Sequence, residues 1–170
     1  CITAAASTVN LISPAPPSVP TTASITQPTC SNPTGTIVFT TQSGVEYSIG
    51  SGYQSSPTFS GLSPATYTLT VRNISDITCI TPAASTVTLN TPVLPSVPTA
   101  ASVIQPTCAT PSGTIVFTTQ SGVEYSVGSG YQSSPTFSGL PPAVYTLSVR
   151  NTIDNSCIRY ASSTVTLATP

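Results

Sequence analysis

The stretch Gly35–Ser48 reads GTIVFTTQSGVEYS, and it recurs unchanged as Gly113–Ser126, 78 positions later. Near its end the apolar residues Val45 and Tyr47 alternate with polar ones, and the alternation continues to Ile49. An apolar period of two is typical of a β-strand with one face in a core and the other in water. A Gln-Ser-Gly triplet, which favours a turn, separates this strand from the GTIVF run before it. The stretch therefore predicts two β-strands joined by a turn.

The repeat extends far beyond this stretch. Gly50–Leu62, GSGYQSSPTFSGL, recurs unchanged 78 positions later, and Ser24–Asn73 differs from Ser102–Asn151 at nine of fifty positions. The first fourteen residues match the pattern that begins again at Cys79. A fixed period of this length is typical of a repeat array. We therefore expect the chain to be a window cut from a longer array.

The same alternation marks the other strands of each repeat. We predict strands at 22–28, 36–41, 45–50, 57–61, 66–73 and 84–90, and again 78 positions later. No segment has the 3.6-residue period or the capping signals of a helix. Short strands with frequent turns predict an all-β fold of tandem immunoglobulin-like or fibronectin-III-like β-sandwich repeats of 78 residues. The predicted core of the first repeat consists of Ile37, Phe39, Val45, Tyr47, Phe59, Leu62, Tyr67, Leu69, Val71, Val87 and Leu89.

Proline-rich segments separate the predicted sandwiches. Proline fixes φ and favours extended polyproline II, so such segments are semi-rigid spacers. The predicted organisation is the C-terminal strand of a preceding repeat at 1–14, a linker at 15–21, repeat 1 at 22–91, a linker at 92–99 and repeat 2 at 100–170.

The composition excludes several classes of partner. Charged residues make up 4% of the chain and the net charge is −1, whereas an ordinary soluble domain has about 25% charged residues. This near-neutral chain lacks the basic surface that binds nucleic acid or anionic lipid. No apolar run approaches the ~20 residues of a membrane span. Since little repulsion keeps copies apart, we expect further copies of the same repeat or chain as partners, with surface glycans as a second class.

Each repeat carries two cysteines, and their pairing has two solutions. We favour disulfides within each module, Cys30–Cys79 and Cys108–Cys157, with Cys1 bonded to an upstream repeat. Each would close a loop of about 50 residues. In the chain-entropy model, that closure stabilises the folded module, whose core is small, by about 4 kcal/mol. The alternative, Cys1–Cys30 and Cys79–Cys108, would cross-link successive modules, and reduced buried cysteines are a third possibility. Either disulfide pattern requires an oxidising compartment, which predicts an extracellular or cell-surface location.

The sequence contains few residues of the types that catalysis or metal binding requires. It has no His and no Lys, so it lacks a general base that titrates near neutrality and a Schiff-base amine. Two cysteines per repeat without His are too few ligands for zinc. The carboxylates Glu46 and Asp76 are predicted to be solvated on a strand face and in a hairpin. We therefore expect no enzyme, no cofactor and no metal.

Two features could contact a ligand or carry a sugar. Tyr53 with Gln54, and Tyr131 with Gln132, lie in Gly/Ser-rich loops, where the ring could stack on a carbohydrate, cap the end of its module or pack on its neighbour. Asn73 begins an Asn-Ile-Ser sequon for N-glycosylation, which the second repeat lacks. Ser and Thr, about a third of the chain, are candidates for O-linked sugar.

Two resemblances refine this interpretation. The segment LSPATYTL, Leu62–Leu69, is similar to the Leu-x-Pro…Tyr corner of fibronectin type III modules with a spacing one residue shorter, which implies that the Tyr67 hydroxyl bonds back to the preceding turn. The pattern from Gly35 through Gly61-Leu62 and YTLTV to Cys79 resembles the SprB-type repeats of large Bacteroidota gliding-motility adhesins. That resemblance covers about fifty residues of each repeat and implies an adhesin.

These observations favour a structural role. We expect a stalk or filament segment of an extracellular bacterial repeat protein, an adhesin or surface fibre, which self-assembles and is glycosylated. A carbohydrate-binding module array and a surface-layer component are the alternatives.

Overall fold

The computed structural model describes residues 15–170 and divides into two compact units. The first unit contains the described part of Cys1–Thr26 together with Gly35–Leu89, and the second contains Gln27–Thr34 together with Asn90–Pro170. The sequence placed Gln27–Thr34 in repeat 1, but its contacts assign this loop to the second unit. The strand predicted at 1–14 lies outside the described residues.

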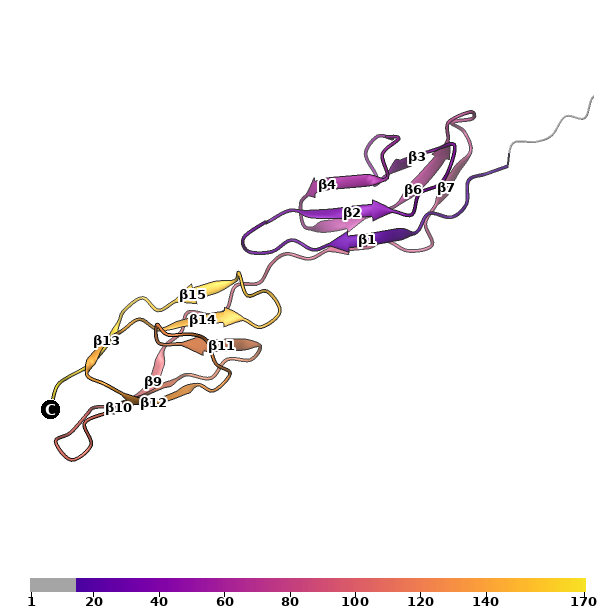
Figure 1. The fold of residues 1–170 in the computed structure, drawn as a ribbon. Coiled ribbons are helices and arrows are strands. Elements are labelled where there is room, and N and C mark those ends of the chain that lie inside the picture. Colours follow the sequence, from indigo (N-terminus) through magenta and orange to yellow (C-terminus); the bar gives the residue numbers. More distant parts are fainter. Residues whose placement is uncertain (1–14) are drawn as a thin grey trace, which may run out of the picture. The chain divides into compact units, whose positions relative to one another are not determined.

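The first unit is built from antiparallel sheets (Figure 1). One sheet has the strand order β1-β2-β4 and the other β3-β6-β7, while β5 pairs with β8. The strands are β1 (Thr22–Thr26), β2 (Gly35–Phe39), β3 (Val45–Ser48), β4 (Thr58–Leu62), β5 (Ala65–Tyr67), β6 (Thr70–Asn73), β7 (Ile80–Pro82) and β8 (Val87–Leu89).

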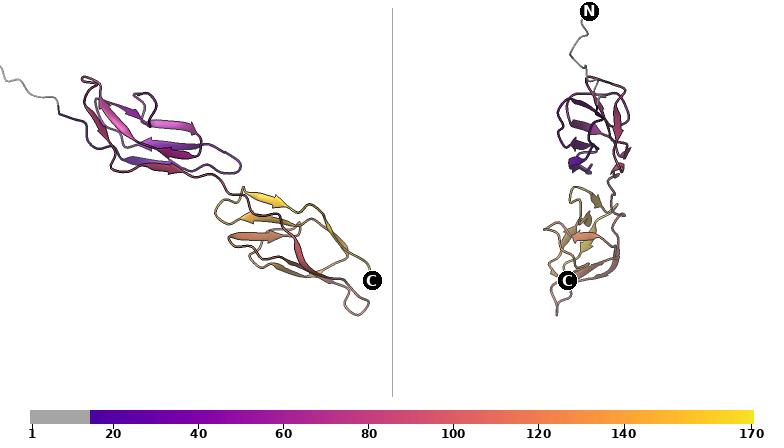
Figure 2. Two further views of the ribbon diagram at one scale, coloured as in Figure 1. Left: turned by 180° about the vertical axis from the view of Figure 1, so that it is seen from behind. Right: turned by 90° about the vertical axis from the view of Figure 1, so that its right-hand side faces the viewer.

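The second unit repeats this topology with the sheets β12-β10-β9 and β11-β14-β15 and the pair β13-β16. Figure 2 shows the strands of both units from behind and from the side. The strands are β9 (Ala100–Ile104), β10 (Gly113–Phe117), β11 (Val123–Ser126), β12 (Thr136–Leu140), β13 (Ala143–Tyr145), β14 (Ser148–Asn151), β15 (Ile158–Tyr160) and β16 (Val165–Leu167). Two sheets of this order are the arrangement of immunoglobulin-like and fibronectin-III-like sandwiches. The predicted fold class is confirmed.

The core of the first unit lies between its two sheets. Every residue predicted for it is either buried in the apolar cluster or packed against that cluster, and the structure adds Ile49 and Ala83. Tyr47 is only 1% exposed. Its hydroxyl accepts a hydrogen bond from the Gln42 N–H at 2.6 Å and donates to the Gln42 carbonyl at 3.2 Å, so the buried oxygen is satisfied. Tyr125 and Gln120 make the same contacts in the second unit.

The strand predicted at 66–73 is two strands. β5 pairs with β8 and β6 pairs with β7, and between them the Leu69 carbonyl accepts a hydrogen bond from the Ala83 N–H at 2.8 Å. The sequence did not predict β7, because this strand lacks a buried alternating face: Ile80 is 50% exposed and Pro82 is exposed at its end. The apolar period cannot reveal a strand of that kind.

A bulge and a tyrosine corner shape the turn from β4 to β5. Between the pairs Gly35–Leu62 and Ile37–Phe59, β4 has one residue more than β2. Gly61 lies in this bulge with φ of 69°, a conformation that glycine adopts without strain. Beyond it the Tyr67 hydroxyl donates to the Ser63 carbonyl at 2.7 Å. The hydrogen bond implied by the fibronectin resemblance is therefore present.

The proline-rich segments are held by the units that follow them. In the first unit, Gln42 Nε2 donates to the Ser18 carbonyl and Thr81 Oγ1 donates to the Pro17 carbonyl. In the second unit Gln120 Nε2 donates to the Ser96 carbonyl. Each linker thus forms part of a module's surface. No helix among residues 15–170 is long and apolar enough to cross a membrane.

Candidate functional site

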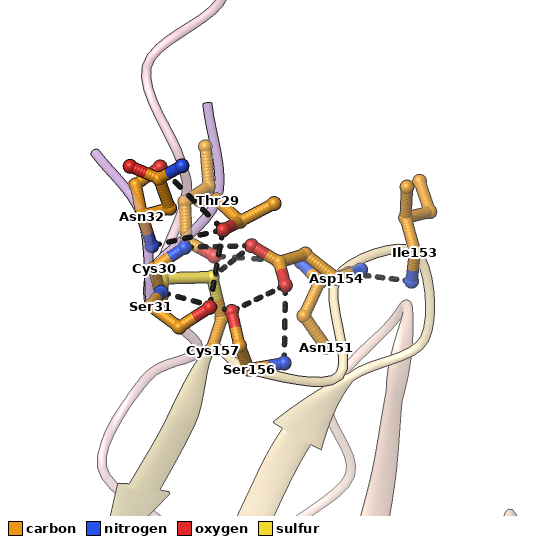
Figure 3. The surroundings of a disulfide bond; sticks show 10 residues. Thr29, Cys30, Ser31, Asn32, Asn151, Ile153, Asp154, Ser156 and Cys157 are labelled. Atoms are coloured by element: carbon orange, nitrogen blue, oxygen red, sulfur yellow. Dashed lines mark hydrogen bonds between the residues drawn. A yellow bond between two sulfur atoms is a disulfide. The ribbon is translucent and has the colours of Figure 1, made fainter. Parts of the chain in front are cut away.

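Cys30 and Cys157 form a disulfide inside the second unit (Figure 3). Cys30 lies in the loop between β1 and β2, and Cys157 ends the turn between β14 and β15, 127 residues further along the chain. Cys79 and Cys108 are free thiols. The predicted pairs Cys30–Cys79 and Cys108–Cys157 are therefore wrong, and the disulfide joins a residue of one sequence repeat to a residue of the next.

The strand register explains why a module cannot close its own disulfide. The Cys30 loop follows Thr26, which pairs with Thr36 at the start of β2. The Cys79 hairpin contains Ile74, whose N–H donates to the Gly44 carbonyl in the turn after β2. The two cysteines thus lie at opposite ends of β2, whose five residues span about 13 Å. A disulfide requires Cα atoms within about 7 Å.

The loop residues Thr29–Asn32 face the hairpin residues Asn151–Cys157, as Figure 3 shows. The Cys30 N–H donates to Asp154 Oδ2 at 2.8 Å, and the Ser31 N–H donates to Ser156 Oγ at 3.1 Å. The Cα atoms of the bonded cysteines are 5.0 Å apart, and Cys157 is 0% exposed. Backbone N–H groups of the loop and side chains of the hairpin therefore support the covalent bond.

Asp154 organises the hairpin side of the site. Its Oδ1 accepts from the Ser156 N–H at 3.0 Å and from the Ser156 hydroxyl at 2.6 Å. Asn151 Oδ1 in turn accepts from the Ile153 N–H at 2.8 Å. Hydrogen bonds from the Ser156 hydroxyl and the Cys30 N–H hold the pKa of the Asp154 carboxyl below its ordinary value of 3.8. The site therefore favours an ionised carboxylate.

The first unit carries the same hairpin with a free thiol. Asp76 Oδ1 accepts from the Thr78 N–H at 3.0 Å and from the Thr78 hydroxyl at 2.6 Å. The Cys79 thiol donates to Asp76 Oδ2 at 3.4 Å. Desolvation and the hydrogen bond to Asp76 raise the pKa of this thiol, while the Thr78 hydrogen bonds lower the pKa of Asp76. The hairpin geometry therefore forms without a bonded partner.

A metal ion does not suit the disulfide site. Cys30, Asp154 and Cys157 bring three potential ligand atoms within 4.8 Å of one another. Both sulfurs are bonded to each other, whereas a metal needs free thiolates. The cluster is a structural cross-link.

The tyrosines predicted to contact a ligand lie beside charged residues. The Arg72 guanidinium lies 4.2 Å from the centroid of the Tyr53 ring, and Arg72 also pairs with Glu46 at 2.7 Å across β6 and β3. Arg150, Glu124 and Tyr131 repeat this arrangement in the second unit. One face of each ring is thus covered by its own module, and Glu46 is ion-paired where the sequence predicted a solvated side chain.

The other residues predicted to contact a ligand or to carry a sugar make hydrogen bonds to residues close to them in the sequence. Gln54 Nε2 donates to the carbonyls of Ser56 and Thr58, and Gln132 makes the equivalent bonds. Asn73 Oδ1 accepts from the Ser75 N–H and hydroxyl, so the sequon forms a tight local turn. Carbohydrate contact by these residues and glycosylation at Asn73 stay predictions.

Sequence reasoning missed the carboxylates that position the cysteines. A signal was nevertheless present, because Asn73-x-x-Asp76-x-Thr78-Cys79 recurs as Asn151-x-x-Asp154-x-Ser156-Cys157. In both copies the acid and the hydroxyl residue precede the cysteine at the same spacing. The structure shows that this motif is the hairpin half of the site.

Solved structures similar to this chain include a set of fibronectin type III domains. The chain is similar to the crystal structure of chicken CNTN1 FN1-FN3 domains, with a TM-score of 0.39 and 17% sequence identity, over 91% of this chain and 68% of that chain. No family model matches the chain, and a search of curated proteins finds no significant match.

Proposed function

We propose that the chain is a structural stalk or fibre segment of an extracellular repeat protein of the adhesin type. The observation that supports this best is the Cys30–Cys157 disulfide, which bonds one repeat covalently to the next. An enzyme or a soluble receptor needs no such bond between residues of successive sequence repeats. A segment that transmits tension gains from it directly.

The position of the disulfide determines which part of the chain bears tension. The strands from β2 to β14 lie between Cys30 and Cys157, so they lie within the loop that the bond closes, whereas β1, β15 and β16 lie outside it. A force applied at the two ends passes through the sulfur–sulfur bond and bypasses this loop. The strands inside the loop can then come apart without lengthening the chain, which suits a stalk.

The buried disulfide supports an extracellular setting, and the low charge content supports association between copies. Disulfides persist in oxidising compartments and are rare in the cytosol, and this one is almost buried, since Cys157 is 0% exposed. Charged residues make up only 4% of the chain, so little repulsion opposes the association of copies. The surface is rich in hydroxyl groups, which suits O-linked glycosylation. A gliding-motility adhesin with SprB-type repeats is the specific form of this proposal.

Single-molecule pulling between the two ends tests the structural role. We expect the oxidised chain to extend only through the residues outside the disulfide loop. Reduction should add on the order of 450 Å, because 127 residues are released at about 3.6 Å each. Cys30→Ser should reproduce the reduced length without reductant.

The matched control is the Cys79→Ser, Cys108→Ser double variant, which removes only the two free thiols found among residues 15–170 and should extend like the oxidised parent. A parent chain that extends to its full length under oxidising conditions would contradict the structural proposal.

A further inference from the structure

The hairpin that holds Cys79 matches the hairpin that holds Cys157. In each, the cysteine N–H donates to the backbone carbonyl of the aspartate at 3.0 Å, and the cysteine carbonyl accepts from the asparagine N–H at 3.0–3.1 Å. Asp154 Oδ2 accepts from Cys30 of the docked loop, whereas Asp76 Oδ2 accepts from the Cys79 thiol. Cys79 is half-buried, and Cys157 beneath its loop is fully buried. The first hairpin is therefore a formed site without its covering loop.

The matching loop is also formed. In the docked loop the Thr29 N–H donates to the Asn32 carbonyl at 2.7 Å, and in the Cys108 loop the Thr107 N–H donates to the Thr110 carbonyl at 2.8 Å. This turn exposes Cys108 to solvent. The loop therefore does not depend on a bonded partner for its shape.

The substitutions between repeats keep the groups that make the contact. Ser31 becomes Ala109, but the docked loop uses the backbone N–H at this position. Ser156 is replaced by Thr78, which retains the accepting hydroxyl. The Cys108 loop can thus make with the Cys79 hairpin the hydrogen bonds that the Cys30 loop makes with the Cys157 hairpin.

We propose that the Cys79 hairpin binds the Cys108-type loop of another repeat, which a second copy of this chain can supply, and that the two cysteines then form a disulfide. Each copy carries one free hairpin and one free loop on different repeats, so the contact is heterologous and propagates into an open series. The proposal deepens the proposed function and rests on it for the oxidising environment. It assigns the two unpaired thiols one role, the covalent joining of modules.

The bond forms by thiol–disulfide exchange with a small disulfide such as oxidised glutathione. The exposed Cys108 thiolate attacks one glutathione sulfur, which forms a mixed disulfide and releases one glutathione thiolate. The Cys79 thiolate of the other copy then attacks Cys108 Sγ and displaces the second glutathione thiolate. The two cysteines are oxidised, one glutathione disulfide is reduced, and the two thiol protons end on two glutathione molecules.

The test uses chains in which Cys1→Ser removes the cysteine outside the described residues, equilibrated in a glutathione redox buffer. We expect a ladder of disulfide-linked oligomers on a non-reducing gel. Cys79→Ser or Cys108→Ser alone should abolish the ladder, and a mixture of these two variants should give one heterodimer, bonded through Cys79 of one chain and Cys108 of the other.

A matched pair of variants tests the hairpin itself. Asp76→Ala in the chain that supplies Cys79 should lower the equilibrium constant for the heterodimer about tenfold, because a charge-assisted hydrogen bond to the loop is lost. The same substitution in the chain that supplies Cys108 should change nothing. Absence of the heterodimer, or homodimers of the single variants in equal yield, would overturn the proposal. Either result would leave the pulling experiment on Cys30–Cys157 unaffected, so the two proposals fail separately.

Discussion

The carboxylate of Asp154 accepts a hydrogen bond from the backbone N–H of Cys30 at 2.8 Å, although 124 positions separate the two residues. The adjacent disulfide joins the same loop to the same hairpin. Because the donor is a backbone group, the contact depends on the shape of the loop and tolerates changes in its side chains. This relationship makes the Cys30 loop part of the second unit and carries the functional proposal.

The Asp154 contact should make the second unit sensitive to acid. The pKa of this carboxyl is lowered in the folded protein, so the ionised form stabilises the fold above about pH 4, and this contribution is lost as the pH falls through the lowered pKa. We expect Asp154→Asn to lower the melting temperature at neutral pH and the difference from the parent to shrink below about pH 4. Thermal unfolding followed by circular dichroism from pH 2 to 7 measures this. Asp76→Asn is the control, and it should leave the melting of the second unit unchanged.

Loss of the disulfide should destabilise the second unit strongly. The bond closes a loop of 127 residues, and the chain-entropy model assigns such a loop roughly 5 kcal/mol. We expect Cys157→Ser to lower the midpoint of chemical denaturation of that unit, and the Cys79→Ser, Cys108→Ser variant to match the parent. Equal midpoints for Cys157→Ser and the parent would show that the bond does not hold the loop in place.

The tyrosine corners should contribute modestly to each module. The Tyr67 hydroxyl donates to the Ser63 carbonyl and the Tyr145 hydroxyl donates to the Pro141 carbonyl, both at 2.7 Å. Tyr67→Phe and Tyr145→Phe remove only these hydrogen bonds, so each should cost about 1 kcal/mol of unfolding free energy in its own unit. Denaturant titration measures the loss, and an effect of Tyr67→Phe confined to the second unit would contradict it.

The stacking of Arg72 on Tyr53 should appear as a coupling energy. The guanidinium lies 4.2 Å from the ring centroid, and an exposed pair of this kind is worth about 0.5–1 kcal/mol. A double-mutant cycle of Tyr53→Ala and Arg72→Ala should return that coupling.

A glycan array with the Tyr53→Ala, Tyr131→Ala variant addresses the carbohydrate-binding alternative, and loss of a bound glycan in the variant would favour that alternative over the stalk.

The sequence predicted the strands and the core because both follow from local periodicity. Val45 and Tyr47 alternate along β3, Leu69 and Val71 alternate along the segment predicted as one strand at 66–73, and all four are buried. β7 was missed since its exposed Ile80 and terminal Pro82 carry no such signal. The local rule thus finds strands that bury one face and misses short strands that do not.

The cysteine pairing is a long-range property, and two equally spaced cysteines per repeat do not determine it. The sandwich topology excludes the pair within one module, because the loop before β2 and the hairpin after β6 lie at opposite ends of a module. The repeat of Asp76 as Asp154 ahead of a cysteine marked the hairpin half of the site. The loop half recurs as Gln-Pro-Thr-Cys at 27–30 and 105–108, but its contacts come from backbone N–H groups, so its side chains do not identify the partner hairpin.

Disulfide mapping of the monomeric protein distinguishes the Cys30–Cys157 bond from bonds within each repeat. Trypsin can cleave after Arg72, Arg150 and Arg159, which places Cys30 on fragment 1–72, Cys79 and Cys108 on fragment 73–150, and Cys157 on fragment 151–159. With Cys1→Ser, blocked thiols and no reductant, the account predicts fragment 1–72 bonded to fragment 151–159, with fragment 73–150 released alone. A single species that joins all three fragments, as Cys30–Cys79 and Cys108–Cys157 would produce, would contradict it.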